Sequence, residues 1–353
     1  MKTWTLPLLF ALACIGSSVS AGVEITDLGT LGGQWSDAYA INNFGQVVGL
    51  SQTASGSSHT FLYDNGKMSD LYPLNGQDSE PMGINNFGQV ASGVIANDGI
   101  YYPAVYDTHT GNIMIPGSFG GVNPGGIAGA AMAINSSGQV VGYSYVPSGE
   151  WHAFFYDKGV MQDIGCLPNE TGVCYSYAID INDRGQVVGG TGSDHAFLYS
   201  DGAMTQIEPA DSSAGRAYSI NNQGQVVGYY YDQSNVGRAF LYSQGVFTAI
   251  GPVDSPYTVA FDINEHGQVV GSAWVVDNDS CRECFAPRAF LYEKGVLTNL
   301  NTLLPSSSEW KLVYAFGIND QGKIIGQGLI HGQYHAFLLQ LASPSAQPMR
   351  HRR

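Results

Sequence analysis

Short segments of alternating apolar residues, separated by Gly, Asn and Asp, recur along the chain and predict β-strands. One phrase, Ile-Asn-x-x-Gly-Gln/Lys, occurs seven times at intervals of 39 to 55 residues. This interval is typical of a four-stranded β unit. The seven copies begin at Ile41, Ile84, Ile134, Ile181, Ile220, Ile263 and Ile318. The chain is therefore predicted to be an array of one repeated β unit.

Each copy is predicted to contain four strands, which the first copy illustrates. Strand A covers residues 38–42, strand B 46–49, strand C 59–63 and strand D 67–71. The A–B and C–D connections hold Gly, Asn and Asp, which adopt the positive φ angles of tight hairpin turns. The B–C and D–A connections are predicted to be long and dissimilar.

Strand A alternates between large and small residues. In the first copy Tyr39 and Ile41 alternate with Ala38 and Ala40. Side chains in a strand point alternately to opposite faces, so we expect the large face of one unit to pack on the small face of the next. The core would then be shared between copies, and no copy would be stable alone.

The two ends of the repeat array predict that it closes into a ring. The seventh copy stops after strand C at residues 335–339, without a strand D. Residues 25–29, Ile-Thr-Asp-Leu-Gly, match a strand D phrase and precede the first strand A. This N-terminal strand is expected to complete the last blade, which removes the open sheet edges. The predicted fold is an all-β, seven-bladed β-propeller over residues 22–341.

Two phrases also carry a family resemblance. Ala-x-x-Ile-Asn-Asn-x-Gly-Gln-Val-Val-Gly and His-Ala-Phe-Leu-Tyr resemble the HAF repeat of bacterial extracellular proteins. The similarity extends over the seven copies, and the second copy departs most, with Pro103-Ala104-Val105 in place of His-Ala-Phe. The resemblance implies export and repetition, and it implies no particular reaction.

The two ends of the chain have their own character. Residues 1–21 combine Lys2, an apolar run and Val19-Ser20-Ala21, the pattern of a cleaved signal peptide. Residues 342–353 are expected to form a disordered basic tail. We therefore expect a secreted or periplasmic protein, with no membrane span. The net charge of −15 disfavours binding to nucleic acid.

Four cysteines follow the signal peptide in two close pairs. Cys166 with Cys174, and Cys281 with Cys284, are predicted to form local disulfides in an oxidising compartment. A redox role for the second pair, which is a C-x-x-C, is the less favoured alternative.

The predicted binding face is the end of the ring that carries the B–C and D–A connections, because variable loops on a repeated scaffold commonly bind ligands. Aromatic rings beside polar groups suit both sugar stacking and protein interfaces. The candidate binding residues are Trp35, Asp78, Tyr102, Trp151, His152, Tyr175, Tyr257, Trp274, Trp310 and Tyr334.

The sequence identifies no catalytic set, metal site or cofactor. The strand C histidines, such as His59, His195 and His335, recur at one position and predict a repeated structural role. Asp277 and its acidic neighbours form a loop that is read as structural, with calcium as the weaker alternative. No phosphate-binding loop, nucleophile elbow or dinucleotide fingerprint is found.

Three functions remain open. The favoured one is a monomeric recognition module that binds a glycan or an extracellular or envelope protein. The second is a polysaccharide-active, lyase-like enzyme, for which His152, Tyr175 and Arg216 are the candidate residues. The third is a structural or assembly protein of the cell surface or periplasm. Tryptophans gathered around one groove would favour the first two functions, and dispersed tryptophans would favour the third.

Overall fold

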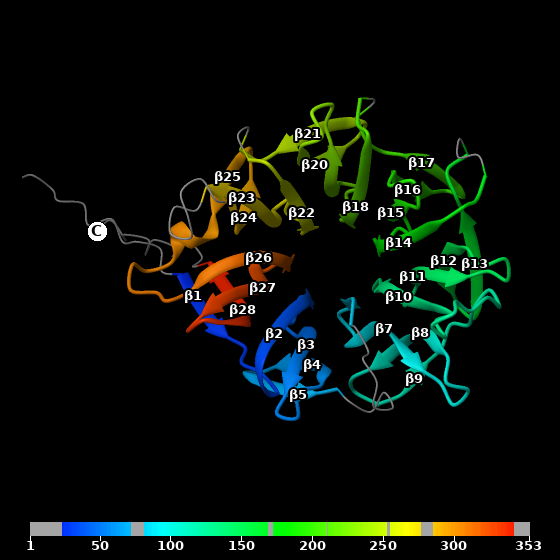
Figure 1. Cartoon of the computed structure of the whole chain (residues 1–353), viewed down its shortest axis with the longest axis horizontal. Coiled ribbons are helices and arrows are strands. Elements are labelled where there is room, and N and C mark those ends of the chain that lie inside the picture. Colours follow the sequence, from blue (N-terminus) through cyan, green and yellow to red (C-terminus); the bar gives the residue numbers. More distant parts are fainter. Residues whose placement is uncertain are drawn as a thin grey trace, which may run out of the picture.

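The computed structural model describes residues 23–71, 81–168, 172–209, 211–252, 255–276 and 285–341. These residues form seven antiparallel four-stranded sheets, arranged as blades around a central axis (Figure 1). Within each blade the strands run from the axis outwards in the order A, B, C and D. The predicted seven-bladed β-propeller is confirmed.

The strands of blades 1 to 3 are β2 (Gly32–Ile41), β3 (Val47–Thr53), β4 (Ser58–Asp64), β5 (Lys67–Asp70); β6 (Gly83–Ile84), β7 (Gln89–Ile95), β8 (Tyr101–Asp107), β9 (Ile113–Met114); β10 (Gly129–Ile134), β11 (Val140–Tyr145), β12 (Trp151–Asp157) and β13 (Val160–Gly165). Those of blades 4 and 5 are β14 (Ser176–Ile181), β15 (Val187–Thr191), β16 (Ala196–Ser200), β17 (Ala203–Gln206); β18 (Ala214–Ile220), β19 (Val226–Tyr231), β20 (Gly237–Ser243) and β21 (Val246–Ile250). Those of blades 6 and 7 are β22 (Thr258–Ile263), β23 (Val269–Val276), β24 (Phe285–Glu293), β25 (Val296–Asn299); β26 (Lys311–Ile318), β27 (Lys323–Ile330), β28 (Gln333–Leu341) and β1 (Val23–Asp27). A single 3-10 turn, η1 (Leu300–Leu303), interrupts the β structure of the described ranges.

Blade 2 has the shortest inner and outer strands, and it is also the copy that departs most from the repeat. Strands β6 and β9 contain two residues each. Pro81 stands where strand A of most other copies has Ala, and proline has no N–H to donate to a ladder. The irregular sequence of this copy thus shortens its inner strand.

Strand A does not alternate as its sequence suggests. In six blades its register shifts by one residue, as between Ala178 and Asp180, so the residue at the shift bulges out of the ladder. The bulged residues line the central channel, and they are Tyr39, Met132, Ile179, Tyr218, Phe261 and Phe316. The extra residue turns the side chains that follow it to the opposite face of the sheet. Ala178 and Ile181 therefore share one buried cluster, and the predicted packing of a large face on a small face is wrong.

The hydrophobic core lies between neighbouring blades. One cluster joins Val141 and Ala153 of blade 3 to Ala178, Val187 and Phe197 of blade 4. The Phe of the repeated strand C phrase is fully buried in six blades, at Phe61, Phe154, Phe197, Phe240, Phe290 and Phe337. Each blade therefore buries its apolar surface only against its neighbours, as the sequence predicts.

The N-terminal strand closes the ring. Strand β1 pairs antiparallel with β28, from Val23 opposite Leu341 to Asp27 opposite Phe337. Figure 1 shows β1, in blue, beside the orange and red strands of blade 7. The predicted closure of the last blade by the N-terminal segment is confirmed.

The connections separate the two ends of the ring less sharply than predicted. The B–C connections of blades 1 to 5 span only four or five residues, and that of blade 7 spans two. The wide variation lies in the D–A connections and in the B–C connection of blade 6. We call the end of the ring with the B–C and D–A connections the long-loop face, and the opposite end the short-turn face.

Several expectations concern residues outside the described ranges. These are the signal peptide, the basic tail, Asp78, the Cys281–Cys284 pair and the acidic loop at Asp277. Within the described ranges, no helix is long and apolar enough to cross a membrane.

Candidate functional site

A concave pocket of about 350 Å³ lies on the long-loop face, between blades 3, 4 and 5. Ring faces and one guanidinium dominate its walls. The lining residues are Met132, Tyr143, Tyr145, Trp151, Tyr177 and Arg216. Trp151 was predicted as a binding residue, and we call this hollow the Trp151 pocket.

A tight hairpin places Trp151 in this pocket. The B–C connection of blade 3 closes with hydrogen bonds from the Val146 N–H to the Glu150 carbonyl oxygen and from the Gly149 N–H to the Val146 carbonyl oxygen. Tyr145 and Trp151 are therefore directly opposite each other at the ends of β11 and β12. Their rings pack edge to face with centroids 5.8 Å apart.

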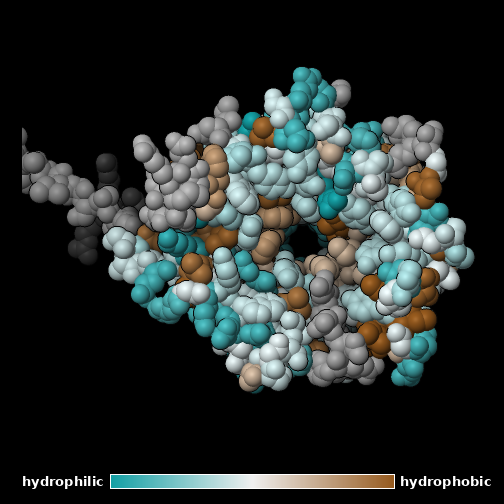
Figure 2. Space-filling view, in the orientation of Figure 1, coloured by the Kyte–Doolittle hydropathy of each residue, from teal (hydrophilic) through white to brown (hydrophobic). Residues whose placement is uncertain are grey.

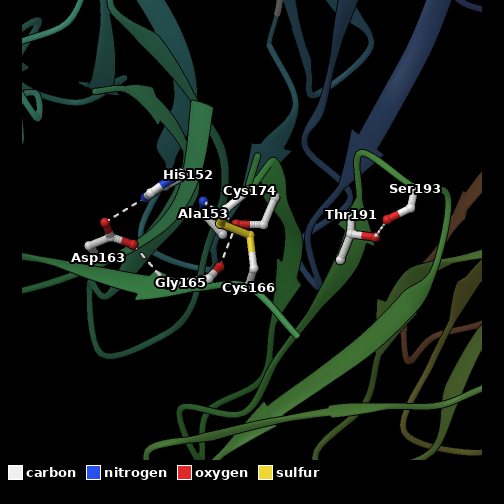
Figure 3. The surroundings of a disulfide bond; sticks show 9 residues. His152, Ala153, Asp163, Gly165, Cys166, Cys174, Thr191 and Ser193 are labelled. Carbon is white, nitrogen blue, oxygen red and sulfur yellow. Dashed lines mark hydrogen bonds and ion pairs between the residues drawn. A yellow bond between two sulfur atoms is a disulfide. The ribbon is translucent and has the colours of Figure 1, made fainter. Parts of the chain in front are cut away.

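A disulfide holds the next aromatic residue in place. Cys166 and Cys174 are bonded, with Cα atoms 6.0 Å apart, as predicted. Figure 3 shows this bond beside the His152–Asp163 pair, where the chain leaves β13 and returns towards β14. Tyr175 follows Cys174 directly, and its ring centroid lies 4.2 Å from that of Trp151. The short loop thus positions Tyr175 against the tryptophan.

Arg216 forms the opposite wall. Its guanidinium lies over the Tyr177 ring, 5.0 Å from the centroid, and Nη2 donates to Asp194 Oδ1 at 2.9 Å. Its charge is therefore paired with a carboxylate. Burial raises the pKa of the Tyr177 phenol above its ordinary value, so that residue is a neutral phenol at physiological pH.

A second group of tyrosines adjoins Arg216 on blades 5 and 6. Tyr229 is its centre, with ring centroids 5.8 Å from Tyr218, 5.6 Å from Tyr231 and 5.9 Å from Tyr257. Burial raises the pKa of Tyr229 to about 12 and raises that of Tyr257 further. We call Tyr218, Tyr229, Tyr231 and Tyr257 the tyrosine group.

The Trp151 pocket opens into the central channel, because Met132, Tyr177 and Arg216 line both. The channel cavity measures about 450 Å³. Figure 2 shows an opening at the centre of the molecule with hydrophobic residues around it. Asp180 and Asp262 lie in its wall, but their oxygens accept bonds from backbone N–H groups, at Ile181 and Ile220 for Asp180.

The repeated Asn of the Ile-Asn phrase surrounds the channel near the short-turn face. Each of the seven side chains donates an N–H to the backbone carbonyl oxygen of the equivalent Asn in the next blade. The chain of bonds runs from Asn42 through Asn85, Asn135, Asn182, Asn221, Asn264 and Asn319 back to Asn42. This closed ring of hydrogen bonds, the Asn ring, was not predicted from the sequence.

The strand C histidines pair with carboxylates of strand D or its continuation. His59 Nδ1 lies 2.8 Å from Asp70, His152 Nδ1 2.7 Å from Asp163, and His335 Nδ1 2.9 Å from Asp27. The same pairing in several blades supports the structural role expected for these residues. His152 is not among the residues that line the Trp151 pocket.

The other predicted binding residues are dispersed around the ring. Trp35 lies on blade 1, Trp274 on blade 6 and Tyr334 on blade 7, the last two partly exposed. Trp310 packs against Phe337 in the core, and the Tyr102 hydroxyl lies 3.0 Å from Asp98. Of the candidates that lie within the described ranges, Trp151, Tyr175 and Tyr257 belong to the aromatic surface around Arg216.

Four of the six residues that line the pocket were not predicted as site residues: Met132, Tyr143, Tyr145 and Tyr177. Tyr143 and Tyr145 are spaced two residues apart after the Val-Val-Gly of strand B, so period-2 alternation places them on one face. That spacing was an available signal. The contribution of Tyr177 and Arg216 from the next two blades depends on the closed ring.

Comparison with known families gives one match. A model described as a protein of unknown function (DUF3466) matches residues 148–250, which is less than half of the chain. The matched segment runs from the hairpin before Trp151 to the end of β21. No curated protein matches the chain in sequence.

Solved structures with a similar fold are β-propellers. The β-propeller domain of the Trilobed protease from Pyrococcus furiosus has a TM-score of 0.51 and 8% identity, covering 89% of this chain and 99% of that one. A Mycobacterium tuberculosis puromycin-hydrolyzing peptidase has a TM-score of 0.52 and 10% identity, covering 83% of this chain and 48% of its own. YCF48, solved with a D1 peptide, has a TM-score of 0.50 and 9% identity, covering 92% and 97%. At these identities the similarity establishes the fold alone.

Proposed function

We propose that this protein is an exported recognition module that binds a glycan or protein ligand through the Trp151 pocket on its long-loop face. The observation that carries the proposal is the concave wall of Tyr145, Trp151 and Tyr177 with Arg216 at its side. Half-buried aromatic rings with polar tips supply contact area at low conformational cost. We also propose that the chain is a HAF repeat protein, on the strength of its repeated phrases.

Binding fits the pocket better than catalysis does. A lyase-like reaction needs a base with a pKa near the working pH, placed beside a cation. Tyr177 lies beside Arg216, but burial raises the pKa of its phenol instead of lowering it. His152 lies outside the pocket lining. Tyr177 is therefore suited to stacking and hydrogen bonding as a neutral phenol, and Tyr175, the candidate named for the lyase-like reaction, packs against Trp151.

A structural or assembly role is the second candidate. The four tryptophans Trp35, Trp151, Trp274 and Trp310 lie on four different blades, and such dispersal was expected for a structural protein. The propeller is commonly a protein-interaction scaffold, and YCF48 with its D1 peptide is one similar fold with a bound partner. The pocket itself, however, is built by one tryptophan and several tyrosines, so it does not require the tryptophans to gather.

The test is a glycan array and a matched pull-down, with the protein from Gly22 onward and its Trp151→Ala variant. We expect saturable binding that weakens at least about tenfold in the variant, because buried Trp residues are frequent energetic centres of interfaces. Phe44→Ala, at an exposed aromatic residue of an A–B turn, is the control and should bind as the parent does. Equal binding by the parent and Trp151→Ala would refute the proposed site.

A further inference from the structure

The Trp151 pocket and the tyrosine group form one continuous aromatic arc. The Trp151 ring packs at a tilt against Tyr175, and Trp151 shares a pocket with Tyr177 and Arg216. Arg216 and Tyr218 both lie on β18, and the Tyr218 ring packs on Tyr229. The arc therefore extends over blades 3 to 6 and is longer than the single pocket.

The arc is built almost entirely of amphipathic rings. It contains Trp151 and seven tyrosines, Tyr143, Tyr145, Tyr175, Tyr177, Tyr218, Tyr229 and Tyr257, with Tyr231 at its edge. A pyranose ring has the matching chemistry, with an apolar C–H face and hydroxyls around its rim. A flat aromatic face can cover the former, while a phenol can donate to or accept from the latter.

A purely apolar protein-docking surface would present large exposed hydrophobic side chains. Among the described residues, Val173 lies in the disulfide loop beside Tyr175, and others of these lie away from the arc. Phe44 and Phe87 are on A–B turns, and Val160, Val246 and Val296 begin strand D of their blades. The chemistry of the arc therefore favours a sugar over an apolar protein surface.

The charge of the arc indicates which class of sugar it binds. Arg216 is the cation in the pocket lining, and it is already paired with Asp194 at 2.9 Å. A uronate or sulfate that approached Arg216 would also lie close to that carboxylate, and the chain as a whole carries a net charge of −15. Anionic glycans would thus meet a repulsion that one guanidinium, already paired with a carboxylate, offsets only in part.

We propose that the arc binds a neutral oligosaccharide in an extended form, with two subsites. Trp151 and its pocket hold one end. Tyr231 and Tyr257, which remain partly exposed around the buried Tyr229, hold the next part of the oligosaccharide. This inference rests on the proposed function and specifies its ligand. The two subsites are joined at Arg216, whose pairing with Asp194 fixes the wall between them.

The test is isothermal titration with neutral gluco-, manno- and chito-oligosaccharides of increasing length, on the protein from Gly22 onward. Affinity for the bound series should rise with length and then level off once both subsites are filled. Trp151→Ala should weaken every length by about tenfold or more. Tyr257→Ala should weaken only the longer oligomers, and Phe44→Ala should change none.

Other outcomes separate this inference from the proposed function. Preferred binding of oligogalacturonate, or equal effects of Tyr257→Ala on all lengths, would overturn the neutral, two-subsite arrangement while leaving the pocket in place. Binding of a purified protein partner that depends on Trp151, without binding of any sugar, would do the same. If no ligand of either kind depends on Trp151, the proposed function itself is wrong.

Discussion

Two buried carboxylates in strand A connect neighbouring blades. Asp180 accepts the N–H of Ile181 in its own blade and the N–H of Ile220 in the next, both at 2.8 Å. Asp262 accepts the N–H of Ile318 at 2.8 Å in the same manner. Burial outweighs these hydrogen bonds and raises the pKa of Asp180 to about 7. The protein thus holds a carboxyl group that titrates near neutrality within its inner wall.

We predict that Asp180 makes the folded state less stable as the pH rises from about 4 to about 7. In that window the folded protein retains a proton that the unfolded chain has lost, so the free energy of unfolding decreases as pH increases. The contribution is complete below about pH 4, absent above about pH 7, and amounts to about 4 kcal/mol at most. Asp180→Asn should flatten this part of the pH profile, measured by urea unfolding between pH 4.5 and 7.5.

The slope, and not the absolute stability, is the informative quantity for this variant. An amide has one acceptor oxygen, so Asp180→Asn leaves one backbone N–H without its acceptor and lowers stability at every pH by about 1–3 kcal/mol. Asp201→Asn, in an exposed C–D turn, provides the control and should keep the parent slope. Parallel profiles for the parent and Asp180→Asn would contradict the assignment.

The A–B turn is the element that explains the repeated phrase. In blade 4, Asn182 Oδ1 accepts the N–H groups of Arg184 and Gln186, which fixes the turn. Its Nδ2 donates to Gln186 Oε1 and to the Asn221 carbonyl oxygen of the next blade. One buried side chain therefore holds its own hairpin and one link of the Asn ring.

We predict that Asn182→Ala destabilises the fold by about 2–5 kcal/mol. The substitution leaves two turn N–H groups without acceptors, and each unsatisfied group costs about 1–3 kcal/mol before relaxation. It also removes one of the two donors to the Asn221 carbonyl oxygen, which keeps the Gly224 N–H. Urea unfolding measures the loss. Ser137→Ala, in the equivalent exposed turn of blade 3, should shift the free energy of unfolding by less than about 0.5 kcal/mol. A similar shift for both variants would show that the Asn ring contributes little.

At the scale of the whole molecule, stability depends on ring closure. Strand β1 supplies the fourth strand of blade 7, and Val23 and Ile25 pack against the core cluster between blades 6 and 7. His335 of β28 pairs with Asp27 of β1, and the Asn ring passes from blade 7 to blade 1 through the bond from Asn319 to Asn42. Because each blade buries its core only against its neighbours, one weak junction exposes two blades.

We predict that Ile25→Glu opens the junction at blade 7. A carboxylate placed against that apolar cluster loses the burial of Ile25 and adds a desolvated charge, a cost of about 2–4 kcal/mol. The unfolding midpoint should fall, and limited proteolysis should cleave near the N-terminal strand. The neighbouring exposed residue provides the matched control, Glu24→Gln, which should behave as the parent. If both variants unfold at the same midpoint, β1 is not needed for closure.

Much of the fold could be predicted from the sequence because the same turn residues and apolar positions recur in the seven copies. Turn residues at fixed offsets from Ile41, Ile181 and their equivalents mark the hairpins, and the displaced strand at Ile25 marks the closure. The Cys166–Cys174 bond was also predictable, since two cysteines eight residues apart in one connection lie within easy reach. These features depend on neighbours along the chain or on simple counting of strands.

The site was less predictable than the fold. The bulge in strand A could not be predicted from the sequence. Trp151 and Tyr175 are recognisable as loop-side aromatics, but their pocket also needs Met132, Tyr177 and Arg216 from three different inner strands. Alternation alone placed Ile181 on the wrong face, because a one-residue register shift at Ile179 reverses the phase. The local pattern of a single copy predicts neither the assembly of the pocket nor the register shift.

The sequence by itself therefore determined the number of blades, the order of their strands and the way in which the ring closes, because these follow from local turn chemistry and from the repeat. Only the tertiary structure decided which aromatic rings meet at Arg216, which residues face the channel and how seven Asn side chains form one ring. These contacts join residues of different copies, and their distances are set by the curvature and bulges of the closed ring.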